Sequence, residues 1–180
     1  MIRNLILLLI VVGCNNDYIL PKPKAFLFKQ FKNQEYYNFD SKCGFSFIVN
    51  KYSIIDSNEC NLKIYNPYLK STIFFTKVNI DDNIMLIQKD FDKKLKENSK
   101  NAFYVKSSEY VNSNKKIYAK YFTFSGDTPS NIQFFITDSI SKYITGSLFF
   151  ESKPNYDSLL PSIEFTNNEI RKLIQSFNWN

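Results

Sequence analysis

The sequence predicts an α+β fold in which helices pack against a largely antiparallel sheet. Short segments rich in β-branched and aromatic residues alternate with turn residues over much of the chain. Two other segments, one near the middle and one at the end, have the 3.6-residue apolar period of helices. A chain of 180 residues that is 17% aromatic can bury one substantial core, so we expect a single domain.

The first residues have the layout of a bacterial lipoprotein signal. The apolar run Leu5–Val12 is less than half the roughly 20 residues that a membrane-spanning helix needs. Arg3 precedes the run, and Val11-Val12-Gly13-Cys14 fits a lipobox. We therefore expect residues 1–13 to be removed and Cys14 to carry the lipid that attaches the protein to a membrane. The alternative, a buried segment with an incidental cysteine, leaves Arg3 unexplained.

A tether follows the signal. Residues 14–24 contain NNDYILPKPK, in which two prolines favour an extended chain. The folded domain is then predicted to occupy residues 25–180.

Four segments in the first part of the domain predict strands. Asn, Pro and Asp separate them, as expected for turns. They are AFLF (Ala25–Phe28), FSFIV (Phe45–Val49), NLKIY (Asn61–Tyr65) and STIFFTKV (Ser71–Val78).

A helix is predicted from Asp81 or Asp82, which are good N-caps, to about Ser99. Apolar residues recur there at steps of three, four and four, which places them on one face that should pack on the sheet. They are Ile84, Ile87, Phe91 and Leu95.

Two hairpins are predicted after this helix, with a turn at Gly126–Pro129 between them. The first joins FYVKSSEYV to KIYAKYFTF around Asn112–Asn114, and the second joins NIQFFIT to KYITGSLFF around Asp138–Ser141.

The end of the chain predicts a second helix. Thr166 and Glu169 match a capping box, and the residues after them have helical apolar spacing. We expect Phe177 and Trp179 to close the core. The spaced apolar residues are Ile170, Leu173, Ile174 and Phe177.

Two cysteines, Cys43 and Cys60, lie within the domain. An even pair in an oxidising compartment is most simply a disulfide. Zinc binding is the weaker alternative, because the chain has no histidine and two carboxylates would have to complete the site. We expect a disulfide, no metal site and no cofactor.

The composition excludes several functional classes. Without histidine there is no Ser–His or Cys–His nucleophile pair. The four glycines are too far apart for a dinucleotide or Walker loop. The net charge of +6 is spread along the chain, which favours a solvated surface over a nucleic-acid partner.

Paired carboxylates are the catalytic chemistry that the composition leaves open. Each candidate also fits a cap, a turn or a surface charge, so the residues favour a domain that is not an enzyme. The candidates are Asp138, Glu151, Asp157 and Glu164.

Several motifs occur in a fixed order between Tyr18 and Trp179. They are YILPKPKAF, CGFSF, CNLKIY, PSNIQFFITDS, GSLFF, KPNYDSLLP and EIRKLIQSFNW. In this order they resemble the gliding motility lipoprotein GldD family of gliding Gram-negative bacteria.

This resemblance implies an accessory lipoprotein of gliding and of the associated type IX protein secretion system, with other proteins of that machinery as partners. It implies no catalytic residues. It assigns the lipid to Cys14 and pairs Cys43 with Cys60. Asn15 rather than Asp follows the lipidated cysteine, which favours the outer membrane, facing the periplasm. A periplasmic lipid- or glycan-binding or hydrolytic domain is the alternative.

A second resemblance concerns the fold. FSFIVNKY and LIQSFNW are similar to the ends of PsbP/Mog1-type domains, in which helices flank an antiparallel sheet.

The segment Ser152–Ser162, SKPNYDSLLPS, is the candidate partner surface. Two prolines restrict its conformations, and Tyr156, Leu159 and Leu160 supply apolar area. The alternative is that these three side chains cap the core.

Overall fold

The computed structural model describes residue 31, residues 34–80 and residues 83–180. The predicted signal, the tether and the strand at Ala25–Phe28 lie outside the described residues. The limits of the predicted domain stay predictions.

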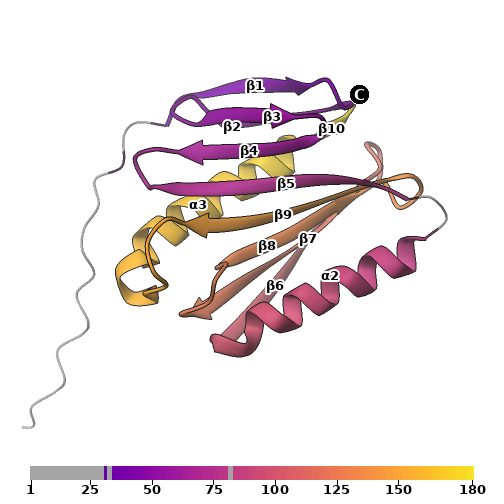
Figure 1. The fold of residues 1–180 in the computed structure, drawn as a ribbon. Helices are drawn as coiled ribbons and strands as arrows, with labels where there is room; N and C mark the ends of the chain where they lie inside the picture. The colour runs from indigo at the N-terminus through magenta and orange to yellow at the C-terminus, as the bar shows by residue number, and fades with distance from the viewer. Residues whose placement is uncertain (1–30, 32–33, 81–82) are drawn as a thin grey trace, which may run out of the picture.

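Two antiparallel sheets and two long helices form the described part of the chain, which confirms the α+β class (Figure 1). The small sheet has the order β1-β2-β10 and the large sheet the order β3-β4-β5-β9-β8-β7-β6. The strands are β1 (Tyr36–Ser41), β2 (Phe45–Asn50), β3 (Ile54–Asn58), β4 (Asn61–Asn66), β5 (Ser71–Asn79), β6 (Ala102–Asn112), β7 (Ile117–Gly126), β8 (Ile132–Thr137), β9 (Lys142–Phe150) and β10 (Asn178–Trp179). The helices are α2 (Ile84–Asn98), the short η2 (Ser99–Asn101) and α3 (Tyr156–Ser176).

The predicted strands at β2, β4 and β5 and both predicted hairpins are confirmed. The sequence reasoning missed β1 and β3. Both are edge strands with mostly exposed or half-buried residues, so neither has the apolar alternation of a strand with one buried face. The likeness to PsbP/Mog1 domains stays a prediction.

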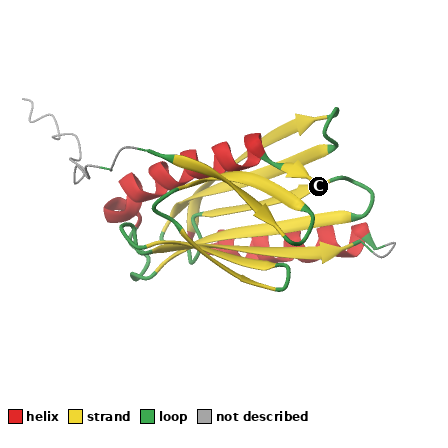
Figure 2. Ribbon diagram, turned by 90° about the horizontal axis from the view of Figure 1, so that it is seen from above, coloured by secondary structure: helices red, strands yellow, loops and turns green. Residues whose placement is uncertain are grey.

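The helices α2 and α3 lie on opposite faces of the large sheet (Figure 1, Figure 2). Side chains alternate between the two faces along each strand. In β8, Phe134 belongs to the core cluster that contains Ile170 and Leu173 of α3, whereas its neighbour Phe135 lies against Phe91 of α2.

The main core lies between the large sheet on one side and the small sheet with α3 on the other. Phe47 of β2 is at its centre, with its ring packed against four other aromatic rings. These belong to Phe39, Phe45, Phe75 and Phe177. Trp179 packs edge-on to Phe177 at 4.7 Å between ring centroids, so the expected closure of the core by these two residues is confirmed.

One glycine lets two aromatic rings meet across the large sheet. Gly146 of β9 is paired with both Phe75 and Phe134, and a Cβ atom there would overlap the Phe134 ring. Because Gly146 has no side chain, the rings of Phe75 and Phe134 lie edge-to-face with centroids 5.2 Å apart.

The predicted start of the C-terminal helix is wrong. Helix α3 begins ten residues earlier, at Tyr156, and its N-cap is Asn155, whose side chain accepts a hydrogen bond from the Ser158 amide at 3.2 Å. Thr166 is buried inside the helix and donates to the Ser162 carbonyl, so there is no capping box at Thr166 and Glu169. Pro161 lies in the second turn, where it removes one donor without ending the helix.

The predicted central helix is confirmed as α2, with Phe91 buried and the other predicted face residues half-buried. It begins at Ile84 with Asn83 as N-cap, and the predicted caps Asp81 and Asp82 lie outside the described residues. Among the described residues, no helix is both long and apolar enough to cross a membrane.

Candidate functional site

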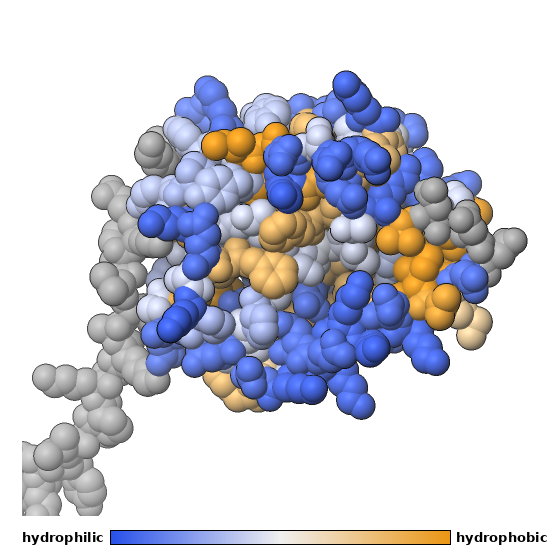
Figure 3. All heavy atoms as spheres, viewed as in Figure 1, coloured by the Kyte–Doolittle hydropathy of each residue, from blue (hydrophilic) through white to orange (hydrophobic). Residues whose placement is uncertain are grey.

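A groove of about 290 Å³ lies between α2 and the large sheet. Its walls come from β5 and β9 on one side and from α2 on the other. This face of the molecule is shown in Figure 3, where pale orange apolar side chains cross the middle between blue hydrophilic ones. The lining side chains used below are Phe74, Thr76, Gln133, Thr145, Ser147 and Phe149.

The groove exists because α2 is fastened mainly at its C-terminal end. The buried side chain of Asn98 donates to the Ser130 carbonyl at 2.7 Å and accepts from the Ser130 amide at 3.0 Å. Near the middle of the helix, Phe91 packs on Phe122 and Phe135, with ring centroids 5.9 and 5.3 Å apart. The helix therefore covers β7 and β8 and leaves the outer part of this sheet face open.

The N-terminal half of α2 presents apolar side chains to solvent. Met85 is 81% exposed and Leu86 is also exposed. This end of the helix adds little to the burial of the sheet.

One buried amide in the groove lacks a partner. Gln133 of β8 is 7% exposed, and its Oε1 atom has no hydrogen-bond partner among the described residues. Because most buried polar atoms in proteins are paired, such an atom needs an explanation.

The groove also contains aromatic and hydroxyl groups. Phe74 and Phe149 are each 39% exposed and lie edge-to-face with centroids 5.7 Å apart. The side chains of Thr76, Thr145 and Ser147 also line it. On α2, Lys94 and Asp90 form an exposed ion pair at 3.5 Å, so the charges in the wall neutralise each other.

A second cavity of about 190 Å³ lies beside the groove, also against Phe91. Its wall includes Tyr143, whose buried hydroxyl has no partner among the described residues. Burial, and secondarily the negative charge of Asp92, raise the pKa of the Tyr143 phenol. Among the described residues the third buried polar atom without a partner is Asn167 Oδ1 on α3, so two of the three lie beneath α2.

The predicted partner residues Tyr156, Leu159 and Leu160 lie in the first turns of α3 and are half-buried. Tyr156 is held in place, because its amide donates to Asp127 at 2.7 Å and its hydroxyl bonds to Ser125 at 3.2 Å. Its ring packs edge-on against Phe103 with centroids 5.6 Å apart.

Two exposed aromatic residues adjoin this segment. Phe103 is 76% exposed and Tyr104 is 60% exposed, and both lie on β6 at the edge of the large sheet. The sequence reasoning placed them in a predicted strand and gave them no surface role. Three consecutive large apolar residues, FYV, were the available signal, since alternation cannot bury all three on one face.

A family model described as gliding motility lipoprotein GldD matches residues 15–179. The chain belongs to this family. The resemblance between Tyr18 and Trp179 is thereby confirmed, and membership makes the chain a lipoprotein associated with gliding motility in the cell envelope. A search of curated proteins finds no match.

The lipid site predicted for this GldD family member, Cys14, lies outside the described residues. The other two cysteines form the predicted disulfide, with their Cα atoms 5.6 Å apart. Cys43 lies in the β1–β2 turn and Cys60 in the β3–β4 turn, so the bond joins the small sheet to the large one.

The four candidate carboxylates have separate environments. Asp138 and Glu151 lie just beyond opposite ends of the nine-residue strand β9, roughly 30 Å apart. Asp157 is in the first turn of α3 and Glu164 is exposed two turns later. No group of three acidic or cysteine side chains suited to a metal ion occurs within the described ranges.

Asp138 closes the β8–β9 turn, as the sequence suggested. Its side chain accepts hydrogen bonds from the amides of Ile140, Ser141 and Lys142 at 2.8–2.9 Å. Burial raises the pKa of this carboxyl, but the hydrogen bonds outweigh burial and hold the pKa below its ordinary value.

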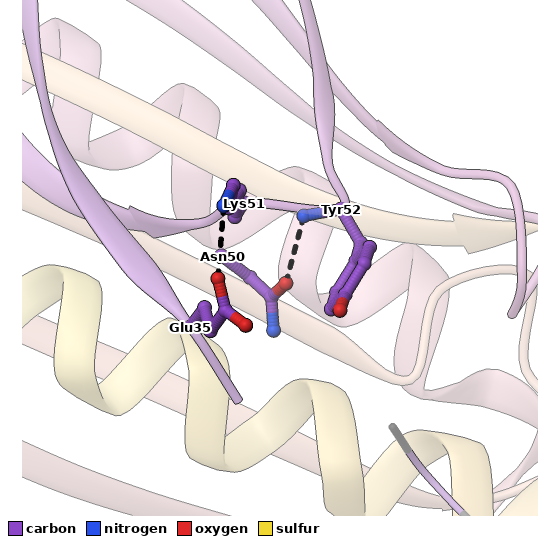
Figure 4. Close-up of polar contacts among 4 residues, drawn as sticks. All are labelled: Glu35, Asn50, Lys51 and Tyr52. Carbon is purple, nitrogen blue, oxygen red and sulfur yellow. Dashed lines mark hydrogen bonds and ion pairs between the residues drawn. The ribbon is translucent and has the colours of Figure 1, made fainter. Parts of the chain in front are cut away.

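The start of the described domain is held against the β2–β3 turn (Figure 4). Lys51 forms an exposed ion pair with Glu35 at 2.9 Å, and its amide donates to the Glu35 carbonyl. Next to this pair, the buried Asn50 accepts a hydrogen bond from the Tyr52 amide at 3.0 Å. The small sheet is therefore fixed close to the point where the N-terminal segment joins it.

Proposed function

We propose that the protein is an accessory lipoprotein of the gliding machinery and of the associated type IX secretion system, and that it acts by contacting other proteins of that machinery. Membership of the GldD family supports the role in gliding. The lipid on Cys14 attaches the domain to the outer membrane, where it faces the periplasm. The domain carries out no catalysis.

The observation that carries the contact mechanism is the exposed aromatic pair Phe103 and Tyr104, which we call the β6 surface. Among the described strands, β6 pairs with β7 alone, so its outer edge offers backbone donors and acceptors to a partner strand. Exposed aromatic side chains beside such an edge are typical anchors of protein interfaces. Tyr156 of α3 packs against Phe103 of this surface, and Leu159 and Leu160 follow it in the first turns of the helix.

A deletion strain complemented with variants tests the proposal. We expect Phe103→Ala with Tyr104→Ala to accumulate normally and yet fail to restore gliding, secretion and crosslinks to partner proteins. Met85→Ala with Leu86→Ala is the matched control, because it removes an equally exposed apolar pair from α2. Full function of the β6 variant would contradict the proposed surface.

The lipid attachment has its own test. Cys14→Ser should remain an unprocessed precursor, since the acceptor of the lipid is missing. Mature, membrane-attached Cys14→Ser protein would contradict the assignment.

Substitution of the four candidate carboxylates distinguishes the contact mechanism from the hydrolytic alternative. We expect Asp138→Asn, Glu151→Gln, Asp157→Asn and Glu164→Gln each to restore gliding. Loss of function in one of them, with normal abundance and partner crosslinks, would favour the hydrolytic alternative.

A further inference from the structure

We propose that the groove between α2 and strands β5 and β9 binds a neutral saccharide of one or two sugar rings. This site goes beyond the contact function of the β6 surface, which lies at the edge of the sheet, three strands away from β9. Its volume of about 290 Å³ is close to the lower end of the range for small-molecule sites, roughly 300 Å³. A mono- or disaccharide is a ligand of that size class.

The unpartnered Oε1 atom of Gln133 is the first argument. A buried acceptor without a hydrogen bond destabilises the folded protein. Gln133 lines the groove, but its Oε1 atom is closed to solvent, so a ligand hydroxyl or amide N–H supplies the missing donor only when the terminal amide turns toward the groove. An acyl chain has no donor and would leave Gln133 unsatisfied.

The exposed pair Phe74 and Phe149 is the second argument. Both rings keep more than a third of their surface in solvent, in a groove that also contains polar groups. The C–H groups on one face of a sugar ring carry slight positive charge and lie well against the negative face of an aromatic ring. The pair therefore offers a stacking surface at one end of the groove.

The remaining wall fits the other groups of a sugar. The hydroxyls of Thr76, Thr145 and Ser147 can both donate and accept. In the described part of the chain they have no side-chain hydrogen bonds that would compete with a ligand. Since Lys94 is paired with Asp90, the groove has no unbalanced charge that would select a phosphate or a carboxylate.

Calorimetric titration of the full lipoprotein in detergent tests the site. The probes are cellobiose and N,N′-diacetylchitobiose, with a neutral blocked tetrapeptide and palmitate as the competing ligand classes. We expect one or both disaccharides to bind at millimolar concentration or tighter. Absence of saccharide binding, or binding of the peptide or palmitate instead, would overturn the proposal.

Gln133→Met gives the sharpest test, because a saccharide site predicts opposite changes in binding and stability. Saccharide affinity should fall by about tenfold or more with the loss of a hydrogen bond to a buried group. The thermal midpoint of the free protein should rise, since the unsatisfied acceptor is gone. Gln175→Met, the same change at an exposed position of α3, should alter neither property. Unchanged affinity in Gln133→Met would overturn the proposal.

Phe149→Leu provides an independent variant outside the core. It keeps an apolar side chain at a partly exposed position and removes the aromatic face, so we expect weaker saccharide binding and a nearly unchanged thermal midpoint. Phe103→Leu on the β6 surface is its control. Since these measurements use purified protein and no motility assay, the saccharide site and the partner contact can fail separately. Equal saccharide affinity in Phe149→Leu and the wild type would contradict the stacking role.

Discussion

The two faces of the large sheet are covered in different ways. On one face, α3 and the small sheet bury a continuous cluster in which Phe47 meets four other aromatic rings. On the other face, α2 buries Phe91 and Asn98, and beneath it lie two of the three buried polar atoms that have no partner among the described residues, those of Gln133 and Tyr143. The comparison separates a face that stabilises the fold from a face with room for a ligand.

This difference has a cause in the chain. Helix α3 is held at its start by the hydrogen bond from the Tyr156 amide to Asp127 and is followed directly by β10, which pairs with β2. Helix α2 is held by Asn98 at one end and lacks a side-chain cap at the other. Groups that bind ligands are commonly drawn from such less stable regions.

The largest expected effect compares one phenylalanine from each face. Phe47→Ala should lower the free energy of unfolding by about 4 kcal/mol, because the cavity is enclosed by other rings. Phe91→Ala should lower it by about 3 kcal/mol, at the low end for this change, because Phe91 borders two solvent-open cavities. Urea unfolding of the two variants measures both values. Equal losses of unfolding free energy in the two variants would contradict the difference between the two faces.

Removal of the disulfide should have the next largest effect. Cys43→Ala with Cys60→Ala should lower the free energy of unfolding by about 3 kcal/mol, because it frees a loop in the unfolded chain. Thiol labelling of the denatured, unreduced wild type provides the check on the bond. Labelling of both domain cysteines there would contradict the disulfide. The loss of stability belongs to the core face, because the bond joins the small sheet to the large sheet.

Asn98→Ala should cost about 2 kcal/mol, since it breaks two buried hydrogen bonds to Ser130. We expect hydrogen exchange of the α2 amides to accelerate far more than that of the α3 amides. Exchange that rises equally in both helices would mean that the faces unfold together. Ser99→Ala is the control, because Ser99 is next in the chain and its hydroxyl makes only an exposed hydrogen bond, to the Lys96 carbonyl. This variant should change the free energy of unfolding little.

Tyr143→Phe should have the smallest effect at neutral pH, a stabilisation of up to about 1 kcal/mol, because it removes an unpartnered hydroxyl. The stabilisation by Tyr143→Phe should grow at alkaline pH. The folded protein holds the phenol proton more tightly than the unfolded chain, so wild-type stability is full below the unfolded pKa of about 10 and declines above it. In Tyr143→Phe this decline should be shallower by about 1.4 kcal/mol per pH unit. Identical decline between pH 9 and pH 11 would place Tyr143 in contact with solvent.

Strands with one fully buried face were predictable from the sequence. In β7, the buried residues Ile117, Ala119 and Tyr121 alternate with half-buried ones, whereas β8 is a largely apolar run that is buried on both faces. The edge strands β1 and β3 were missed because their backbone pairs without burying such a face. The early start of α3 was missed because Pro161 suggests a break, although one lost donor in the second turn of a long helix is tolerated.

The candidate site divides in the same way. The cysteine pair and the turn role of Asp138 were predicted, since each depends on local sequence and compartment. Phe103 and Tyr104 were placed in a predicted strand without a surface role, because sequence cannot show that β6 is an edge strand.

The sequence by itself determined the α+β class, the helix at α2 with its apolar face, the hairpins and the family, because each depends on periodicity or on motifs that are read along the chain. Tertiary structure decided which face each helix covers and which strands end the sheet. It also brought Gln133 of β8 into a groove with Phe74 of β5 and Phe149 of β9. The physical reason is that strand order and helix seating depend on long-range packing, whose free energy comes from contacts between residues far apart in the chain.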